Sequence, residues 1–120
     1  MSNKALGKWG ENQAARHLKK QGYRILKRNL KVSRGEIDIV ASKDNVLVFI
    51  EVKSQEGKGP VAPEVRVGYS KQKQISKLAK HYLQRSKGQY DEIRMDVISV
   101  YRLDGRSEIQ HIEGAFGAVE

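Results

Sequence analysis

The sequence contains no cysteine, only two prolines and no long hydrophobic run. The absence of cysteine excludes disulfides, thiolate zinc sites and cysteine nucleophiles. No apolar stretch approaches the length of a membrane-spanning helix, and the first residues lack the apolar segment of a signal peptide. We therefore expect a cytoplasmic protein without membrane contact. The three histidines, His17, His81 and His111, are dispersed and do not form a zinc motif.

Acidic residues are scarce relative to basic ones. The 120 residues include 23 Lys and Arg against 14 Asp and Glu, which gives a formal net charge of +9. A small domain this basic predicts a nucleic-acid partner, which we take to be DNA, although a basic surface can also serve solubility alone. The length permits one hydrophobic core, so residues 1–120 are expected to form a single domain.

Hydrophobic periodicity and turn residues divide the chain into seven predicted elements. Helices are expected at 4–21 and 71–85, the second with Ser70 as its N-cap. Strands are expected at 22–29, 35–41, 46–54, 92–101 and 107–112. Residues 55–69 contain both prolines and three glycines, which predicts a long loop. Such a loop either closes over a bound strand or is a simple connector.

The segment 35–54 predicts a hairpin around which the other elements are arranged. Side chains alternate along a strand, and its second strand is apolar on both faces until Glu51, which is typical of a central, covered strand. Glu51 and Lys53 then share one face. Asp38 lies within an apolar run of the first strand, where an isolated carboxylate is costly unless it is paired or binds a metal.

Asp38 and Glu51 together match the ligands that magnesium prefers, one or two carboxylates supplemented by waters and phosphate oxygens. Such a metal would activate water for attack on a phosphodiester. Lys53 could orient that water or stabilise charge developing on phosphorus. The alternative is that this acid and base simply occupy the wet face of a half-exposed sheet.

Glu11 is a candidate third carboxylate on the first helix. Small and apolar residues recur on one helix face at four-residue spacing: Leu6, Gly10, Ala14 and Leu18. Glu11 borders this face and could reach toward Asp38 and Glu51. The alternative is a boundary residue paired with Lys8 or Arg28.

Cations surround the predicted site. The candidate nucleic-acid-binding residues, from the connection before the hairpin, the long loop and the second helix, are Arg34, Lys58, Arg66, Lys71, Gln72 and Lys73. Their density suits phosphate contacts. It equally suits a solvated surface that discourages edge strands from pairing.

The order of motifs resembles the YraN family of uncharacterised endonuclease-like proteins along nearly the whole chain. The matching segments are G-K-W-G-E-N-Q-A-A-R-H-L at 7–18, R-G-E-I-D-I-V at 34–40, V-F-I-E-V-K at 48–53, K-Q-K at 71–73 and R-M-D-V-I-S-V at 94–100. The pattern is also similar to the PD-(D/E)xK nuclease superfamily and, more distantly, to archaeal Holliday-junction resolvases. Ile37 departs from the motif, which has proline before the aspartate.

This resemblance implies an α/β, restriction-endonuclease-like αβββαβ core with a mixed central sheet flanked by helices. It implies that Asp38 and Glu51 bind Mg²⁺, or alternatively Mn²⁺, with the Val52 carbonyl as a further ligand. Lys53 would then assist the nucleophile and Glu11 would complete the site. Either Lys71 or Gln72 would reach this site from the second helix.

We therefore expect a metal-dependent DNA endonuclease, acting on branched or repair intermediates. Cutting two strands of a junction would require two sites, which makes a homodimer plausible. The alternatives are a non-catalytic nucleic-acid-binding module and an accessory protein that docks onto DNA-processing partners. Fold alone does not decide among these functions.

Overall fold

The computed structural model describes residues 1–32, 35–58, 67–86 and 88–117. Two helices and five strands follow one another in the order α1 (Asn3–Lys20), β1 (Arg24–Val32), β2 (Gly35–Lys43), β3 (Val46–Glu56), α2 (Tyr69–Ser86), β4 (Glu92–Leu103) and β5 (Arg106–Phe116). The predicted order of two helices and five strands, including the αβββαβ core, is confirmed. No helix within these described ranges is long and apolar enough to cross a membrane.

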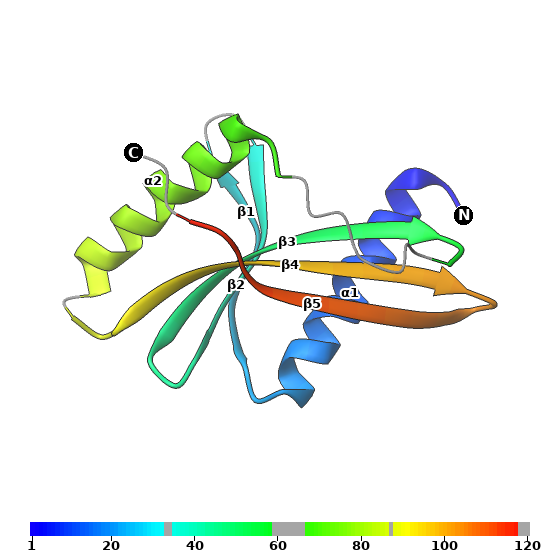
Figure 1. The fold of residues 1–120 in the computed structure, drawn as a ribbon, viewed down its shortest axis with the longest axis horizontal. Coiled ribbons are helices and arrows are strands. Elements are labelled where there is room, and N and C mark those ends of the chain that lie inside the picture. Colours follow the sequence, from blue (N-terminus) through cyan, green and yellow to red (C-terminus); the bar gives the residue numbers. More distant parts are fainter. Residues whose placement is uncertain (33–34, 59–66, 87, 118–120) are drawn as a thin grey trace.

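The five strands form one mixed sheet in the order β1-β2-β3-β4-β5. Neighbouring strands pair antiparallel except β3 and β4, which are parallel. Parallel neighbours need a crossover connection, and α2 lies within it. Figure 1 shows the two helices well apart, with the twisted sheet passing between them. The expected mixed sheet flanked by helices is confirmed.

Several predicted boundaries were wrong by a few residues, and the largest difference is at β5, which ends at Phe116 rather than at residue 112. β1 begins at Arg24 rather than at residue 22, because the amides of Gly22 and Tyr23 still bond to carbonyls of the last turn of α1. α2 begins at Tyr69, so Ser70 lies inside the helix instead of capping it. β3 continues to Glu56 because its last residues pair with β4. Residues 59–66 of the predicted loop lie outside the described residues.

Each face of the sheet contacts a different helix. The cluster on the α1 face includes Ala14, Leu18, Ile39, Val48 and Ile50. The cluster on the α2 face includes Ile37, Leu47, Phe49, Ile75 and Ala79. Alternate residues of β3 therefore enter opposite clusters, which confirms that this strand is central and covered on both sides.

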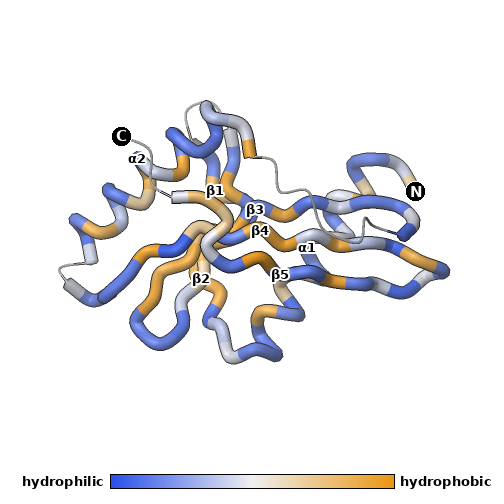
Figure 2. The backbone as a smooth tube through the Cα atoms, viewed as in Figure 1, coloured by the Kyte–Doolittle hydropathy of each residue, from blue (hydrophilic) through white to orange (hydrophobic). Residues whose placement is uncertain are grey.

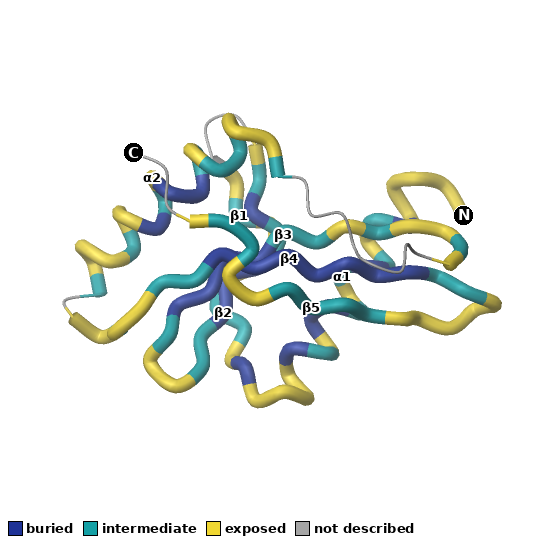
Figure 3. The backbone as a smooth tube through the Cα atoms, in the orientation of Figure 1, coloured by how far each residue is buried: buried dark blue, intermediate teal, exposed yellow. Residues whose placement is uncertain are grey.

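Hydropathy and burial follow the same arrangement. Figure 2 shows hydrophobic residues along the middle strands and hydrophilic ones at the turns. In Figure 3 the buried stretches run along β3 and β4, while the outer ends of the strands are exposed. Exposure rises along β3 from the fully buried Ile50, through half-buried Glu51, to exposed Lys53. The acidic residues of β3 thus lie where the core ends.

Candidate metal centre

Strand β2 is irregular at Asp38. β2 and β3 pair from Lys43 to Ile39, and their pairing ends there. At the next position a side chain takes the place of a backbone carbonyl as hydrogen-bond acceptor. The Asp38 Oδ2 accepts a hydrogen bond of 2.8 Å from the Val52 N–H. Side-chain alternation also breaks here, since Ile37 and Ile39 pack on opposite faces of the sheet. The divergence of the two strands opens the space in which the acidic side chains meet.

Three carboxylates converge at this opening. One carboxylate oxygen from each of Glu11, Glu36 and Asp38 lies within 4.8 Å of the other two, and all three residues are partly buried. Glu11 comes from α1, whereas Glu36 and Asp38 are two residues apart on β2. Asn29 of β1 has a positive φ of 52°. With its amide nitrogen turned toward the cluster, it donates to Glu11 at 2.6 Å and to Glu36 at 2.7 Å.

Glu51 borders this cluster and contacts a lysine from the second helix. Its Oε2 atom is buried and accepts no hydrogen bond from the described residues. The Lys71 ammonium lies 3.4 Å from that oxygen and also donates to the Glu36 carbonyl. Lys71 thus reaches the site from α2, as the sequence resemblance implied for Lys71 or Gln72.

Burial and neighbouring charges both shift the pKa values of the site carboxylates. Burial, together with the charges of Asp38 and Glu36, raises the pKa of Glu11. Burial raises the pKa of Asp38 despite the hydrogen bond from Val52. Burial and the charge of Asp38 raise the pKa of Glu51, which Lys71 offsets in part. Proximity of like charges disfavours ionisation of each group. Burial therefore opposes ionisation of all three groups, and the Asp38 charge adds to this at Glu11 and Glu51.

The donor set fits a hard divalent cation. All the converging groups are carboxylate oxygens, which are the ligands of magnesium, calcium and manganese. The buried Glu51 oxygen accepts no hydrogen bond and has the Lys71 ammonium at 3.4 Å, so it is a further ligand that a metal ion could take over from Lys71. Raised pKa values of carboxylates in a shared site are typical of functional sites. The cluster of Glu11, Glu36 and Asp38 can thus bind a metal ion.

The other predicted site residues are distributed as follows. Lys53 is exposed on β3, and its charge lowers the pKa values of Asp38 and Glu51 slightly against the effect of burial. Gln72 does not reach the carboxylates, because its side chain donates to the Val67 carbonyl at 2.7 Å. The nucleic-acid-binding candidates Lys58 and Lys73 are both exposed. The other two, Arg34 and Arg66, lie outside the described residues.

Glu36 is the member of this cluster that the sequence patterns did not single out. Its spacing of two residues from Asp38 was the available signal, because residues i and i+2 of a strand share a face. The alternative partner considered for Glu11 is also close, since the charge of Arg28 lowers the pKa of Glu11 against the raising effects. Glu11 is therefore both a boundary residue near Arg28 and a member of the acidic cluster.

A second acidic group lies away from this cluster. Asp96 is fully buried in β4 and accepts hydrogen bonds of 2.9 Å from Arg94 Nε and Nη2. It also accepts from the Gly114 amide and lies 2.7 Å from His111 Nε2. Burial alone would raise the pKa of Asp96, but the bonds from His111 and Arg94 outweigh it and hold that pKa below its ordinary range. Asp96 is therefore paired with Arg94 and takes no part in the acidic cluster.

The chain is similar to several known proteins. A family model described as "Uncharacterised protein family UPF0102" matches residues 10–100. UPF0102 proteins of Syntrophotalea carbinolica and Clostridium perfringens are 42% identical over 112 residues and 43% identical over 116 residues. The first alignment covers 93% of this chain and 91% of the relative, and the second covers 95% of each.

A solved structure also shows a distant likeness. Pyrococcus furiosus SfsA in complex with Ca²⁺ matches with a TM-score of 0.36 and 20% sequence identity. The match covers 92% of this chain, which spans 61% of that protein's chain.

Proposed function

This chain belongs to the UPF0102 (YraN) family of uncharacterised proteins, and we propose that it is a metal-dependent nuclease that hydrolyses phosphodiester bonds in DNA. One observation carries this proposal: three carboxylates from α1 and β2 converge within 4.8 Å, although burial raises the pKa values of Glu11 and Asp38 and neighbouring carboxylates raise that of Glu11 further. Without a ligand this arrangement opposes folding. A bound cation would offset the free-energy cost of bringing these carboxylates together.

Magnesium, or manganese in its place, is the metal we propose. Glu11, Glu36 and Asp38 would hold it, with Glu51 and the Val52 carbonyl as further donors from β3. When bound, the ion supplies Lewis acidity to a phosphate oxygen and lowers the pKa of a coordinated water. Asp38 has a second task, because its bond to the Val52 N–H fixes the backbone of β3 beside the site.

Two lysines supply positive charge on the α2 side. The Lys71 ammonium already lies against Glu51 and can move toward a phosphate oxygen once a metal neutralises that carboxylate. Lys53 is exposed two residues beyond Glu51 and can hold the attacking water or the phosphate. Preorganised charges of this kind stabilise the transition state of phosphoryl transfer.

The surface charge supports a nucleic-acid substrate. The exposed cations of β1 and α2 include Arg24, Lys27, Arg28, Lys31, Lys73, Lys77 and Lys80, and the chain has a net charge of +9. Such surfaces bind the phosphate backbone with little dependence on sequence. Substrate choice then depends on the shape of the DNA, which makes branched or repair intermediates the first substrates to examine.

A non-catalytic nucleic-acid-binding module is the second candidate. It is favoured by the contact between Lys71 and Glu51, because a lysine that permanently neutralises the acids would make a metal unnecessary. Metal dependence separates the two candidates.

The test is cleavage of end-labelled linear, flapped and four-way DNA with Mg²⁺, with Mn²⁺, or with a chelator. Wild type is compared with Asp38→Asn and Glu51→Gln, which remove charge but keep size. Asp91→Asn is the matched control, because Asp91 is an exposed residue just before β4. We expect metal-dependent cutting by wild type and the control and at least a hundredfold loss in the two site variants. Equal DNA binding by all four proteins without any cutting would reject the nuclease in favour of the binding module.

A further inference from the structure

A second concave site lies on the α2 face of the sheet. It is a pocket of about 480 Å³ between the C-terminal half of α2, β1 and the segment before β4. Leu30, Leu78, Tyr82 and Tyr90 supply its apolar walls, and each is partly buried. Pockets for small organic ligands have volumes of about 300 to 1,000 Å³. The cavity is therefore large enough for one aromatic ring system.

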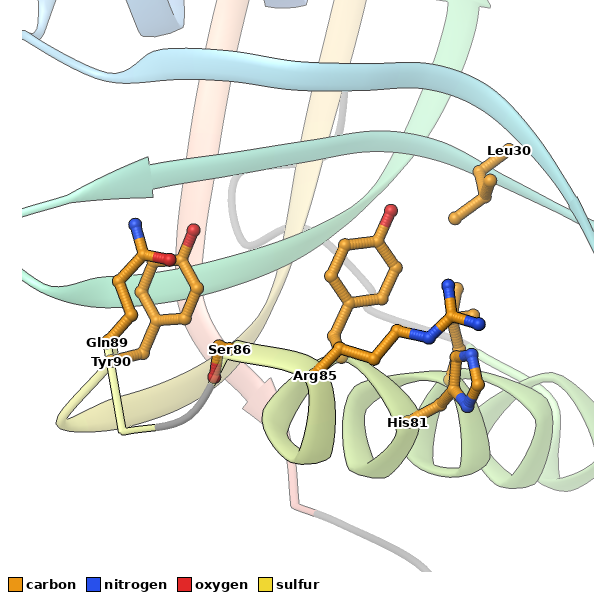
Figure 4. A pocket seen from close by; sticks show the side chains of 8 residues that line it. Leu30, His81, Arg85, Ser86, Gln89 and Tyr90 are labelled. Atoms are coloured by element: carbon orange, nitrogen blue, oxygen red, sulfur yellow. The ribbon is translucent and has the colours of Figure 1, made fainter.

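The walls of this pocket are suited to a flat ring. The Tyr82 ring packs edge-on against Phe49, with 5.8 Å between ring centroids and an interplanar angle of 80°, so its orientation is fixed by the core. Tyr90 contributes a second phenol at the end of the pocket away from Leu30 and His81, as Figure 4 shows. Aromatic side chains bind nucleobases by stacking, and this stacking depends little on which base is present.

The rim of the same pocket is polar and basic. His81 and Arg85 rise from α2 toward Leu30 of β1, and Gln89 lies beside Tyr90 (Figure 4). All three polar residues are exposed. An Arg guanidinium suits a phosphate, and a carboxamide suits the donor and acceptor edge of a base. A purely apolar ligand would use none of these groups, whereas a nucleotide would use all of them.

The pocket and the acidic cluster are connected by two elements. Leu30 directly follows Asn29, whose amide contacts Glu11 and Glu36. Lys71 and His81 belong to the same helix, ten residues apart, which corresponds to about 15 Å along its axis. A nucleic-acid strand advances about 3.4 Å per nucleotide in a duplex. A strand at the acidic cluster can therefore reach the pocket within a few nucleotides.

We propose that this pocket receives one unpaired nucleobase of the DNA strand whose backbone lies at the acidic cluster. The inference rests on the proposed function and narrows its substrate to DNA with an unpaired nucleotide near the scissile bond, such as a bulge, flap or single-stranded end. A fully paired duplex would first have to extrude a base, which costs a few kcal/mol of stacking and pairing.

Binding can be tested without metal and without cleavage. The full-length protein is titrated with adenosine 5′-monophosphate in a chelating buffer, and the ring resonances of Tyr82 and Tyr90 are followed by NMR. Ribose 5-phosphate, which lacks the base, is the matched ligand. We expect both rings to shift with the nucleotide only, and Arg85→Gln to weaken binding several-fold while Arg106→Gln, an exposed arginine at the start of β5, does not. Equal shifts with ribose 5-phosphate, or no shift in either ring, would overturn the pocket assignment.

Cleavage then separates this inference from the proposed nuclease. Duplexes carrying a one-nucleotide bulge are compared with the same duplexes in which the bulged nucleotide is abasic. We expect a roughly five- to hundredfold preference for the base, the range that stacking of one base provides, and loss of that preference in Tyr90→Leu. Cutting without such a preference would overturn the pocket and leave the nuclease intact. Nucleotide shifts in a protein that cuts nothing would support the pocket and reject the nuclease.

Discussion

Replacing Asp38 with asparagine should stabilise the metal-free protein. The asparagine carbonyl oxygen can still accept the hydrogen bond that the Val52 N–H donates to Asp38. The substitution removes the charge that raises the pKa values of both Glu11 and Glu51. The variant therefore loses repulsion while it keeps the contact that supports β3.

The size of this effect follows from the spacing of the carboxylates. Two unit charges at the cluster limit of 4.8 Å repel by about 3.5 kcal/mol at an effective dielectric constant of about 20. Loss of the attraction of Lys71 and Lys53 for Asp38 offsets part of this gain. We expect a net stabilisation of about 1 to 2 kcal/mol, comparable to one unit of pKa. In a domain of this size that raises the melting temperature by roughly 3 to 10 °C.

The gain should depend on pH in a defined direction. Because the pKa values of these carboxyl groups are raised in the folded state, folding retains protons that the unfolded chain releases above about pH 4. Wild type accordingly loses stability as pH rises from about 4 through the raised pKa values. The advantage of Asp38→Asn should be largest near pH 7.5 and should shrink toward pH 4.

Thermal unfolding followed by circular dichroism, with a chelator present, measures this difference at each pH. Asp91→Asn, on the exposed segment before β4, controls for the general loss of one negative charge. The contrary result is an Asp38→Asn variant that melts at a lower temperature than wild type at pH 7.5 while the Asp91→Asn control melts at the wild-type temperature. That result would show that the carboxylates do not repel one another as the geometry requires.

Three further predictions concern metal binding and packing. Millimolar Mn²⁺ should raise the melting temperature of wild type but not of Asp38→Asn; an equal rise in both would place any metal elsewhere. Asp96→Asn should lower the unfolding free energy measured in urea by about 3 to 5 kcal/mol, because Arg94 loses its buried partner; a loss below about 1 kcal/mol would contradict this. Gly10→Ala should destabilise by about 1 to 3 kcal/mol, because an added Cβ would lie 2.8 Å from Ser54 Cβ. Its control, Gly7→Ala, meets nothing within 4 Å and should gain up to about 1 kcal/mol from helix propensity; similar effects at both glycines would refute the packing argument.

The fold was largely predictable because its periodicities are strong. The unbroken apolar run of 46–50 requires burial on both faces of its strand, and the four-residue spacing on α1 requires burial of one helix face. The structure buries all of these faces. Boundaries were less predictable where tertiary contacts decide them. The last residues of β3 are polar and read as loop, but their pairing with β4 extends the strand to Glu56.

The sequence predicted a site built from carboxylates, but it did not identify every residue of the acidic cluster. Asp38 and Glu51 stand out because each is a carboxylate next to an apolar run. Glu36 does not stand out, because it lies beside Gly35 near a turn, where an acid is unremarkable. Its role depends on the divergence of β2 from β3 and on the positive φ of Asn29. Those are properties of paired strands, so the sequence offers only the two-residue spacing of Glu36 and Asp38 and not the geometry that brings Glu36 to the cluster.

The parallel pairing of β3 with β4 also affects how fast the chain folds. Val46 pairs with Glu92 and Glu56 with Arg102, so every partner across this ladder is 46 residues away in sequence (92 − 46 and 102 − 56). Loop-closure entropy must be overcome before such distant contacts contribute, and proteins dominated by non-local pairing fold slowly for their size. Until the ladder closes, the apolar edge of β3 is open to pairing with other chains. The central position that makes β3 a rigid support for Glu51 thus also leaves one of its apolar edges exposed until β4 is synthesised and pairs with it.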